Sequence, residues 1–200
     1  MKADTGCLFP SNDPLFKIYH DTEWGYPVSN DTRIFEKICL EGFQSGLSWQ
    51  TILHRREFFR VAFDQFNIDK VAKYSEIDLC RLLADSNIIR NRRKIVSAIN
   101  NANRALELQS EFGSLAHFIW QYEPKDEKRP ELVTRAWLAK NTMTEESTGL
   151  SHALKKRGWK FIGPTNMYAL MQALGLVNDH TADCTCRDKV EKAREQFSRP

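Results

Sequence analysis

Apolar side chains recur every three or four residues along most of the chain, and the alternation typical of strands is scarce. Such spacing gathers apolar side chains on one face of an α-helix. Asp31 and Ser48 are residue types that favour helix N-caps, and glycines stand where helices should stop. The pattern predicts an all-α fold with helices at residues 31–43, 48–63, 68–74, 77–84, 87–108, 114–122, 151–157 and 165–174, and with ends at Gly113, Gly158 and Gly175.

Two polar stretches interrupt this helical pattern. Residues 123–131 are expected to form a surface loop of little functional content between a helical bundle and a C-terminal lobe. Residues 187–200 are charge-rich and are expected to form a frayed helix or a tail. A chain of 200 residues can bury one substantial core but is short for two independent domains, so a single domain over residues 1–200 is predicted.

Glu41 interrupts the apolar face of the helix predicted at residues 31–43. It follows Ile38 by three residues and Ile34 by seven, so helical spacing places its carboxylate among apolar side chains. A carboxylate in such a place is costly without a partner. If the helix continued, Trp49 would lie on the same side, and the two would wall a pocket suited to a flat cation. The alternative is a structural Glu41 that answers a buried arginine or caps a neighbouring helix.

Tyr19 and Trp24 offer further aromatic walls for this pocket, although aromatic residues at such spacings usually belong to the core. Glu23, directly before Trp24, is expected at the surface.

Composition and charge narrow the class of protein. Hydrophobic residues make up 42% and charged residues 28%, as in ordinary folded proteins. Neither a membrane span nor the apolar core of a secretory signal is visible, so a cytoplasmic protein without a membrane partner is expected. The net charge of +3 is too small to identify a partner, but two segments are locally basic. Polyanion binding is one interpretation and solvated helix faces the other; the residues concerned are Arg90, Arg92, Arg93, Lys94 and Arg104, then Lys155, Lys156, Arg157 and Lys160.

A metal site is one interpretation of the cysteines and histidines near the two ends of the chain. The chain has five cysteines, and this odd number makes a disulfide framework improbable. Two thiolates and two imidazoles can close a tetrahedral zinc site, which would be structural and would join the termini. Unrelated buried thiols and a surface histidine are the alternative. The candidate ligands are Cys7, His20, His180 and Cys184, and Cys186 can replace Cys184.

Residues 155–165 read as the end of a helix, a glycine-flanked turn and the start of a new helix. Pro164 suits the first helical position, and Gly163 can bring the backbone close to a ligand. Free amides at that helix start favour a phosphate, and four basic residues lie within the segment or just before it. A nonspecific grip on a nucleic acid backbone is one interpretation, and an ordinary helix–helix corner is the other.

Long blocks of the sequence together resemble the DNA-3-methyladenine glycosylase I family. The resemblance is close, spans almost the whole chain and follows the family's order. It rests on residues 13–15, 19–25, 40–49, 155–165 and 175–180.

The resemblance implies a helix-hairpin-helix DNA glycosylase fold in which residues 159–163 form the hairpin that holds DNA phosphates, with Lys160, Gly163 and Thr165 as DNA-binding residues. It also implies a structural zinc ion that joins the N- and C-terminal segments. The family's ligands fall on Cys7, His20, His180 and Cys184, which leaves Cys186 outside the set.

The base pocket of the family falls on Tyr19, Glu41 and Trp49, with Phe9 and Phe16 as further walls. Phe9 departs from the tryptophan more usual there and offers less stacking area. N3-methylation makes adenine cationic, so an aromatic face and the catalytic carboxylate of Glu41 bind it better than neutral adenine. The base then leaves as neutral 3-methyladenine without a proton from a general acid, and water attacks the sugar.

Two further features bear on the reaction that the resemblance implies. The catalytic aspartate that many relatives carry after the hairpin is missing here, because the first acid after Gly163 is Asp179. No lysine suggests itself as a Schiff-base nucleophile, so hydrolysis without strand cleavage is expected. Leu47 resembles the family's wedge, which fills the gap left by a flipped base; the alternative is a core leucine.

The sequence therefore predicts an enzyme that excises 3-methyladenine from double-stranded alkylated DNA, with no obligate protein partner. The competing hypothesis is a zinc-stabilised protein that binds damaged DNA without excising the base. Only the enzyme predicts free base in solution.

Overall fold

The computed structural model of the protein describes residue 7 and residues 12–200. Every regular element in these residues is helical, which confirms the all-α prediction. None of the helices in this described part has the length and apolarity that a membrane span requires. The elements are α1 (Pro14–Thr22), α2 (Asp31–Gln44), α3 (Trp49–Ala62), η1 (Asp64–Phe66), α4 (Ile68–Val71), α5 (Glu76–Ala84), α6 (Arg92–Phe112), α7 (Leu115–Trp120), η2 (Asp126–Lys128), α8 (Arg135–Lys140), α9 (Glu145–Lys156), α10 (Pro164–Ala173) and α11 (Arg187–Gln196).

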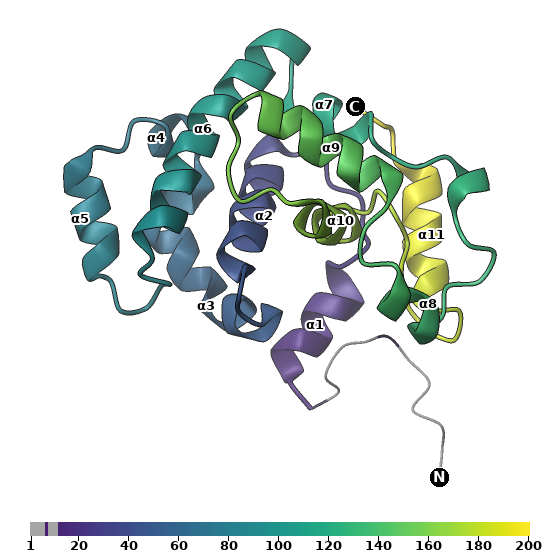
Figure 1. Cartoon of the computed structure of the whole chain (residues 1–200). Coiled ribbons are helices and arrows are strands. Elements are labelled where there is room, and N and C mark those ends of the chain that lie inside the picture. The colour runs from purple at the N-terminus through teal and green to yellow at the C-terminus, as the bar shows by residue number, and fades with distance from the viewer. Residues whose placement is uncertain (1–6, 8–11) are drawn as a thin grey trace.

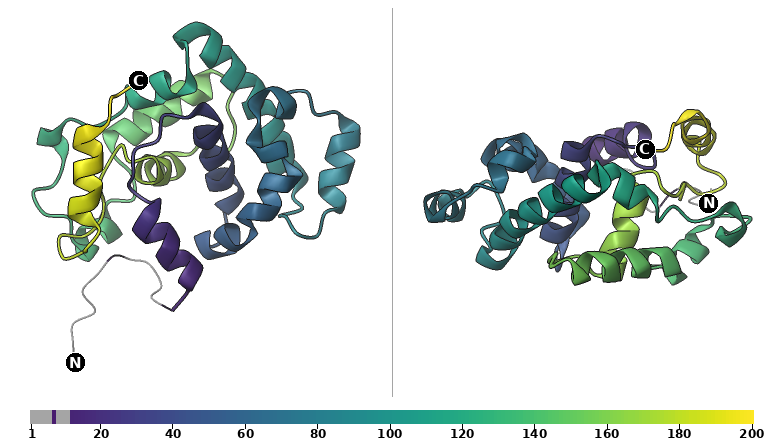
Figure 2. Two further views of the ribbon diagram at one scale, coloured as in Figure 1. Left: turned by 180° about the vertical axis from the view of Figure 1, so that it is seen from behind. Right: turned by 90° about the horizontal axis from the view of Figure 1, so that it is seen from above.

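Helices α2 and α10 lie at the centre of the molecule (Figure 1). Helix α2 packs against α3, α6, α7 and α10, and all of its residues from 34 to 43 are buried. Helix α5 lies at one end of the molecule and α11 at the other, as both views of Figure 2 show. Because α2 is enclosed on every side, its polar residues are forced into the interior, and Glu41 is one of them.

Helix caps explain several element boundaries and correct one prediction. Ser48 caps α3 as expected, with its Oγ accepting from Thr51 N at 3.1 Å. Asn30, and not Asp31, caps α2. The Asp31 carboxylate instead accepts from the backbone N–H of Leu115 and Ala116 at 2.9 Å each, at the start of α7. One short acidic side chain thus ties the start of α2 to a helix far along the chain.

Glycine ends α6 and α10 for conformational reasons. Gly113 follows α6 with φ of 82°. Gly175 lies just after α10 with φ of 76°, and a Cβ there would come within 2.6 Å of the backbone at Tyr26 and Pro27. The segment after α1 therefore packs against the end of α10 through a position that only glycine tolerates.

The sequence pattern missed two α-helices, misplaced the start of a third and misjudged the C-terminus. Helices α1 and α8 were not predicted, and α9 begins at Glu145 rather than at Ser151, because polar residues and Gly149 obscure its first turns. The stretch predicted as a frayed helix or tail forms α11, whose Val190 is fully buried. Arg199, beyond that helix, pairs with Glu123 at 2.9 Å. The C-terminus is therefore docked onto the body of the protein.

Two cations of the basic segments are engaged in contacts within the protein. Lys94 is buried and donates from Nζ to the carbonyl oxygens of Phe43 at 2.8 Å and Ser45 at 2.6 Å. Arg157 pairs with Glu111, with 2.8 Å between Nη2 and Oε1. The prediction of free surface charge was wrong for these two cations. Exposed side chains remain at Arg90, Arg92, Arg93, Lys155, Lys156 and Lys160.

Candidate functional site

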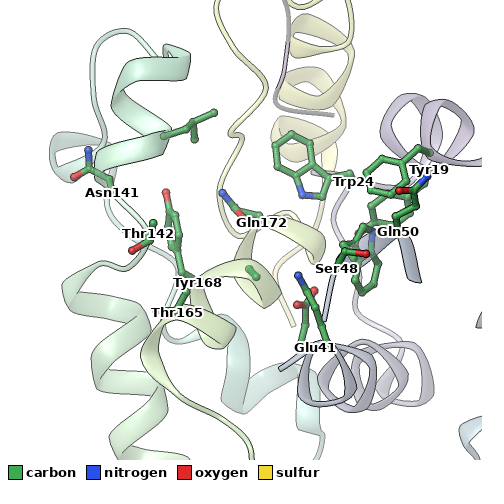
Figure 3. A pocket seen from close by; sticks show the side chains of 15 residues that line it. Tyr19, Trp24, Glu41, Ser48, Gln50, Asn141, Thr142, Thr165, Tyr168 and Gln172 are labelled. Carbon is green, nitrogen blue, oxygen red and sulfur yellow. The ribbon is translucent and has the colours of Figure 1, made fainter. Parts of the chain in front are cut away.

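A pocket of about 500 Å³ opens between α1, the α2–α3 turn, the α8–α9 turn and α10. In Figure 3, one side of the pocket carries Tyr19, Ser48 and Gln50, and the other side carries Asn141, Thr142, Thr165 and Tyr168. Gln172 lies between these two groups. The lining residues are Phe16, Tyr19, Trp24, Glu41, Gln44, Ser48, Trp49, Gln50, Leu138, Asn141, Thr142, Thr165, Tyr168, Ala169 and Gln172.

Glu41 presents its carboxyl group to this pocket. The residue is 5% exposed, and the structure gives its side chain neither an arginine partner nor a helix to cap among the described residues. Burial raises the pKa of Glu41 to about 8, against the opposing effect of the Lys37 ammonium. This geometry disfavours the structural interpretation of Glu41, because a structural carboxylate would be expected to have a partner.

Aromatic side chains from separate elements surround Glu41. Tyr19 and Trp49 lie with their ring centroids 5.4 Å apart and their planes tilted by 47°. Phe16 is buried and lines the same pocket. The predicted wall at Phe9 lies outside the described residues. Glu41 and Trp49 lie on separate helices, as the ranges predicted at residues 31–43 and 48–63 imply, because α2 ends at Gln44 and Trp49 begins α3.

A buried group of charges lies behind Tyr19. Glu23, which was expected at the surface, is partly buried and receives two hydrogen bonds from Arg56, at 2.8 Å and 2.7 Å. Arg56 and Lys37 also approach the Tyr19 ring, with 5.9 Å and 5.5 Å to its centroid. Burial raises the pKa of Tyr19, so its hydroxyl group stays protonated at neutral pH.

The α2–α3 turn holds Leu47 at the surface, where 41% of it is exposed. Gly46 makes this turn possible with φ of 77°. Lys94 holds the carbonyl groups at the end of α2, and Asn166 Nδ2 donates to Ser45 Oγ at 3.0 Å. Leu47 is therefore an exposed apolar side chain on a firmly held turn, and not a core leucine.

Residues 157–163 connect α9 and α10 and contain the hairpin predicted at residues 159–163. Two neighbouring asparagines of α6 bind the backbone of this connection: Asn100 Nδ2 donates to the Gly158 carbonyl at 3.0 Å. Asn101 donates to the Lys160 carbonyl at 3.0 Å and accepts from the Lys160 N–H at 2.9 Å. The loop is thus fixed by side chains that no local pattern in the sequence identified.

The predicted DNA-binding residues of this segment lie near one another along the chain but differ in setting. Lys160 is exposed. Gly163 precedes α10 as its N-cap, and open space surrounds the position of a Cβ there. Thr165 is exposed and lines the pocket. The start of α10 therefore borders the mouth of the pocket.

Four predicted metal ligands, from opposite ends of the chain, form one cluster. The ligand atoms of Cys7, His20, His180 and Cys184 all lie within 4.8 Å of one another. Cys184 Sγ lies 3.3 Å from His180 Nδ1 and 3.6 Å from His20 Nε2, and Cys7 Sγ lies 3.7 Å from His180 Nδ1. Zinc bond lengths in a tetrahedral site imply sulfur–nitrogen separations of about 3.6 Å, so the donor set fits this ion.

Hydrogen bonds around the cluster orient both histidines so that one ring nitrogen of each faces the cysteines. His180 Nε2 contacts the Trp24 carbonyl at 3.0 Å, which turns Nδ1 toward the cysteines. His20 Nδ1 contacts Asp21 at 2.8 Å, which turns Nε2 the same way. Burial lowers the pKa of His180 to about 4, so this imidazole is neutral at pH 7, as a metal ligand must be. Cys186 falls in a different group, with His20 and Asp21.

Sequence reasoning missed the far wall of the pocket. Tyr168 and Gln172 lie one turn apart on α10, and Asn141 and Thr142 come from the α8–α9 turn. The available signal was the pair of polar side chains at helical spacing on an otherwise apolar helix. The α8–α9 turn carried no comparable signal, because the helix before it was not predicted.

Known proteins share both this fold and long stretches of this sequence. The family described as methyladenine glycosylase matches residues 9–188. DNA-3-methyladenine glycosylase 1 of Escherichia coli (strain K12) is 45% identical over 180 residues, which cover 90% of this chain and 95% of the relative. A crystal structure of 3-methyladenine DNA glycosylase I has a TM-score of 0.83 at 45% identity and covers 91% of this chain and 99% of its own. A variant of 3-methyladenine DNA glycosylase I in complex with 3-methyladenine has a TM-score of 0.82 at 32% identity, with coverages of 88% and 94%.

These matches extend over almost the whole chain and agree with the resemblance found in the sequence blocks. The chain belongs to the methyladenine glycosylase family.

Proposed function

We propose that the protein is a DNA glycosylase that hydrolyses the N-glycosidic bond of 3-methyladenine in alkylated DNA. The single observation that carries this proposal is the buried Glu41 carboxyl group, which faces a pocket with aromatic walls and forms no hydrogen bond or salt bridge with another side chain among the described residues. A cationic base would supply the missing partner. A relative of the same fold was solved in complex with 3-methyladenine, which supports the choice of base.

The reaction begins with the damaged nucleotide flipped out of the duplex and into the pocket. Trp49 stacks on the base, Tyr19 adds a polar contact, and Glu41 accepts a hydrogen bond from the exocyclic amine. These contacts favour the cation over neutral adenine. Because the base leaves as neutral 3-methyladenine, the bond breaks without a general acid. Water then attacks the developing sugar cation from solution.

Hydrolysis without strand cleavage is part of this proposal. A lyase needs an amine that can attack the sugar, and the pocket has no lysine among its lining residues in the described part of the chain. Lys37, the nearby buried lysine, lies over the Tyr19 ring and is outside that lining.

The α9–α10 connection supplies the grip on double-stranded DNA in this proposal, as a helix-hairpin-helix element. Exposed Lys155, Lys156 and Lys160 offer charge to the phosphates, and the start of α10 offers backbone amides near Thr165. Because this start borders the pocket, phosphates held here would lie beside the flipped nucleotide.

Structural zinc at Cys7, His20, His180 and Cys184 is also proposed. When bound, the ion would join α1 to the segment before α11 and would take no part in bond cleavage. The donor set closes four positions and leaves none for a reacting water. Since α1 carries Tyr19 next to His20, the ion would stabilise one wall of the pocket.

The remaining expectations stay predictions: a single domain over residues 1–200, action in the cytoplasm and no obligate protein partner. The competing function is damage recognition without excision. Incubation with methylated duplex DNA separates the two, because only the enzyme produces free base. The proposed enzyme leaves strands that break only after alkali; nicked strands before alkali would contradict the hydrolytic mechanism.

The activity is expected to depend on pH through Glu41. Burial raises the pKa of this carboxyl to about 8, so below that pH it becomes neutral and loses its attraction for a cationic base. The value of kcat/KM should fall toward acid by up to about tenfold per pH unit, since it reports ionisation of the free enzyme. Glu41→Gln should flatten this limb. A wild-type profile that stays level from about pH 6 to pH 9 would contradict this assignment.

Leu47→Ala is expected to slow excision by about tenfold, because the small side chain no longer fills the gap left by the flipped base. Single-turnover release of base and affinity for duplex DNA check this effect. Ile77→Ala is the matched control, since Ile77 is an 82% exposed apolar side chain on α5. If Leu47→Ala leaves the rate of excision and the affinity for DNA unchanged, Leu47 does not fill the gap left by the flipped base.

A further inference from the structure

The carboxylate of Asp179 lies directly behind two polar residues of the pocket. Asp179 is 1% exposed, and its Oδ2 accepts hydrogen bonds from Tyr168 Oη at 2.7 Å and from Gln172 Nε2 at 2.8 Å. Arg129 forms an ion pair with Oδ1 from the other side. The Arg129 guanidinium also donates to Tyr168 Oη at 3.4 Å and lies 5.4 Å from the Trp137 ring centroid. Asp179 is thus a fully partnered, buried anion.

This arrangement dictates which way the Gln172 amide points. A carboxylate paired with arginine accepts hydrogen bonds and donates none. The NH₂ group of Gln172 must therefore face Asp179, and Oε1 must face away from it. The same rule commits the Tyr168 hydroxyl hydrogen to Asp179. The amide orientation follows from the partner's chemistry and not from the placement of atoms alone.

The outward Oε1 belongs to the lining of the pocket. Gln172 contributes to this lining together with Glu41, and the structure gives its Oε1 no hydrogen-bond partner among the described residues. In Figure 3, Gln172 stands between Tyr168 and Trp24. The pocket therefore carries a neutral acceptor in addition to the Glu41 carboxyl group.

We propose that Gln172 is a specificity-determining residue whose Oε1 accepts a hydrogen bond from the bound cationic base, and that Asp179 is the positioning residue that fixes this acceptor. The proposal rests on the proposed function and deepens it.

A fixed acceptor discriminates between the damaged and the normal base for a physical reason. Neutral adenine has acceptors at N1, N3 and N7, which repel an acceptor on the protein. Methylation at N3 replaces one of them with an alkyl group, and the positive charge makes the exocyclic amine, the donor that both bases share, a stronger donor. Without Asp179 the amide of Gln172 could rotate and offer its NH₂ group, which would remove the preference. The orientation of one amide thus contributes to selectivity.

The test measures binding of free 3-methyladenine by quenching of tryptophan fluorescence. The free base is neutral but keeps the exocyclic amine that would donate to Oε1. Gln172→Met keeps the length of the side chain and removes the acceptor, so affinity should fall by about fivefold, the size expected of one hydrogen bond between neutral groups. Asp179→Asn should cause a loss of similar size. The double variant should lose no more than either single one, because both act through the same hydrogen bond.

Gln109→Met is the matched control. Gln109 also donates from Nε2 to an aspartate, at 2.7 Å to the partly buried Asp31, but it lies on α6 outside the pocket. The affinity of the Gln109→Met protein for 3-methyladenine should equal that of the wild type. Wild-type affinity in Gln172→Met, or losses that multiply in the double variant, would overturn the proposal.

A second measurement uses the wild-type protein and therefore needs no substitution next to His180. In NMR spectra of the wild-type protein, added 3-methyladenine should shift the side-chain carbonyl carbon of Gln172, while its amide hydrogens stay protected from exchange. A large shift or loss of protection at the amide hydrogens would show that the NH₂ group meets the base, which contradicts the assignment. Base binding is read independently of excision, so failure of this inference is distinguishable from failure of the proposed function.

Discussion

Glu41→Gln is expected to slow release of 3-methyladenine by about 10²- to 10³-fold, the cost typical of removing one electrostatic group from a preorganised site. Glutamine keeps the shape of the side chain but removes the negative charge that would stabilise the cationic base. Single-turnover release from methylated duplex DNA measures the effect.

The fold should survive this substitution. Glu41 has no partner to leave behind among the described residues, and its burial disfavours the charged form, so the melting temperature should stay equal or rise. Glu36→Gln provides the contrast on the same helix, because Glu36 pairs with Arg60 at 2.8 Å. That variant should lose stability and retain excision activity. A wild-type rate in Glu41→Gln would remove the carboxylate from the mechanism.

Loss of the zinc cluster is expected to destabilise the protein more than any surface change. Cys184→Ser removes the sulfur that lies between both histidines, and it should abolish stoichiometric zinc. A loss on the order of 4 kcal/mol would lower the melting temperature by roughly 8–16 °C in a chain of this size. Metal analysis and thermal melts of the purified protein measure both quantities.

Cys186→Ser is the matched control for the zinc prediction. Cys186 is buried and lies two residues from the half-buried Cys184, but it stands outside the four-ligand cluster. It should therefore keep zinc and most of the stability. Full zinc content in Cys184→Ser, or loss of zinc only in Cys186→Ser, would contradict the assigned ligand set.

The position of Glu41 could be predicted because it follows from helical spacing alone. In a strongly periodic segment, helical spacing determines which side chains lie on the buried face, and this carboxylate is one of them. The pocket around it could not be derived in full, since its walls come from α1, α8, α9 and α10 as well as from α2 and α3. Local periodicity carries no information about which distant helices meet.

Lys94 shows why the interpretation of charge was less reliable. A cluster of basic residues suggests a solvated face, and nothing local marks one member as buried. Its partners are carbonyl groups at the end of α2, some 50 positions earlier in the chain, where the helix leaves acceptors unsatisfied. Such a contact becomes visible only when the helices are packed.

The metal ligands and Asp179 could be predicted only in part, less well than Glu41 and better than the contacts of Lys94. The residue types of Cys7 and His180 raised the possibility of a site, but only the folded chain brings residue 7 to residue 180. Asp179 was noted only as an acid too far from the hairpin for a familiar role. Its contacts with Tyr168 and Gln172 depend on how the chain turns after α10.

Glycosylase activity is tested best by a time course of base release from methylated duplex DNA, with the zinc-loaded wild-type protein and Glu41→Gln side by side. We expect the wild type to release 3-methyladenine, to leave 7-methylguanine in the DNA and to outpace Glu41→Gln by at least about 10²-fold. If folded, zinc-loaded wild-type protein binds this DNA and releases no base, the protein is a damage-binding module and not a glycosylase.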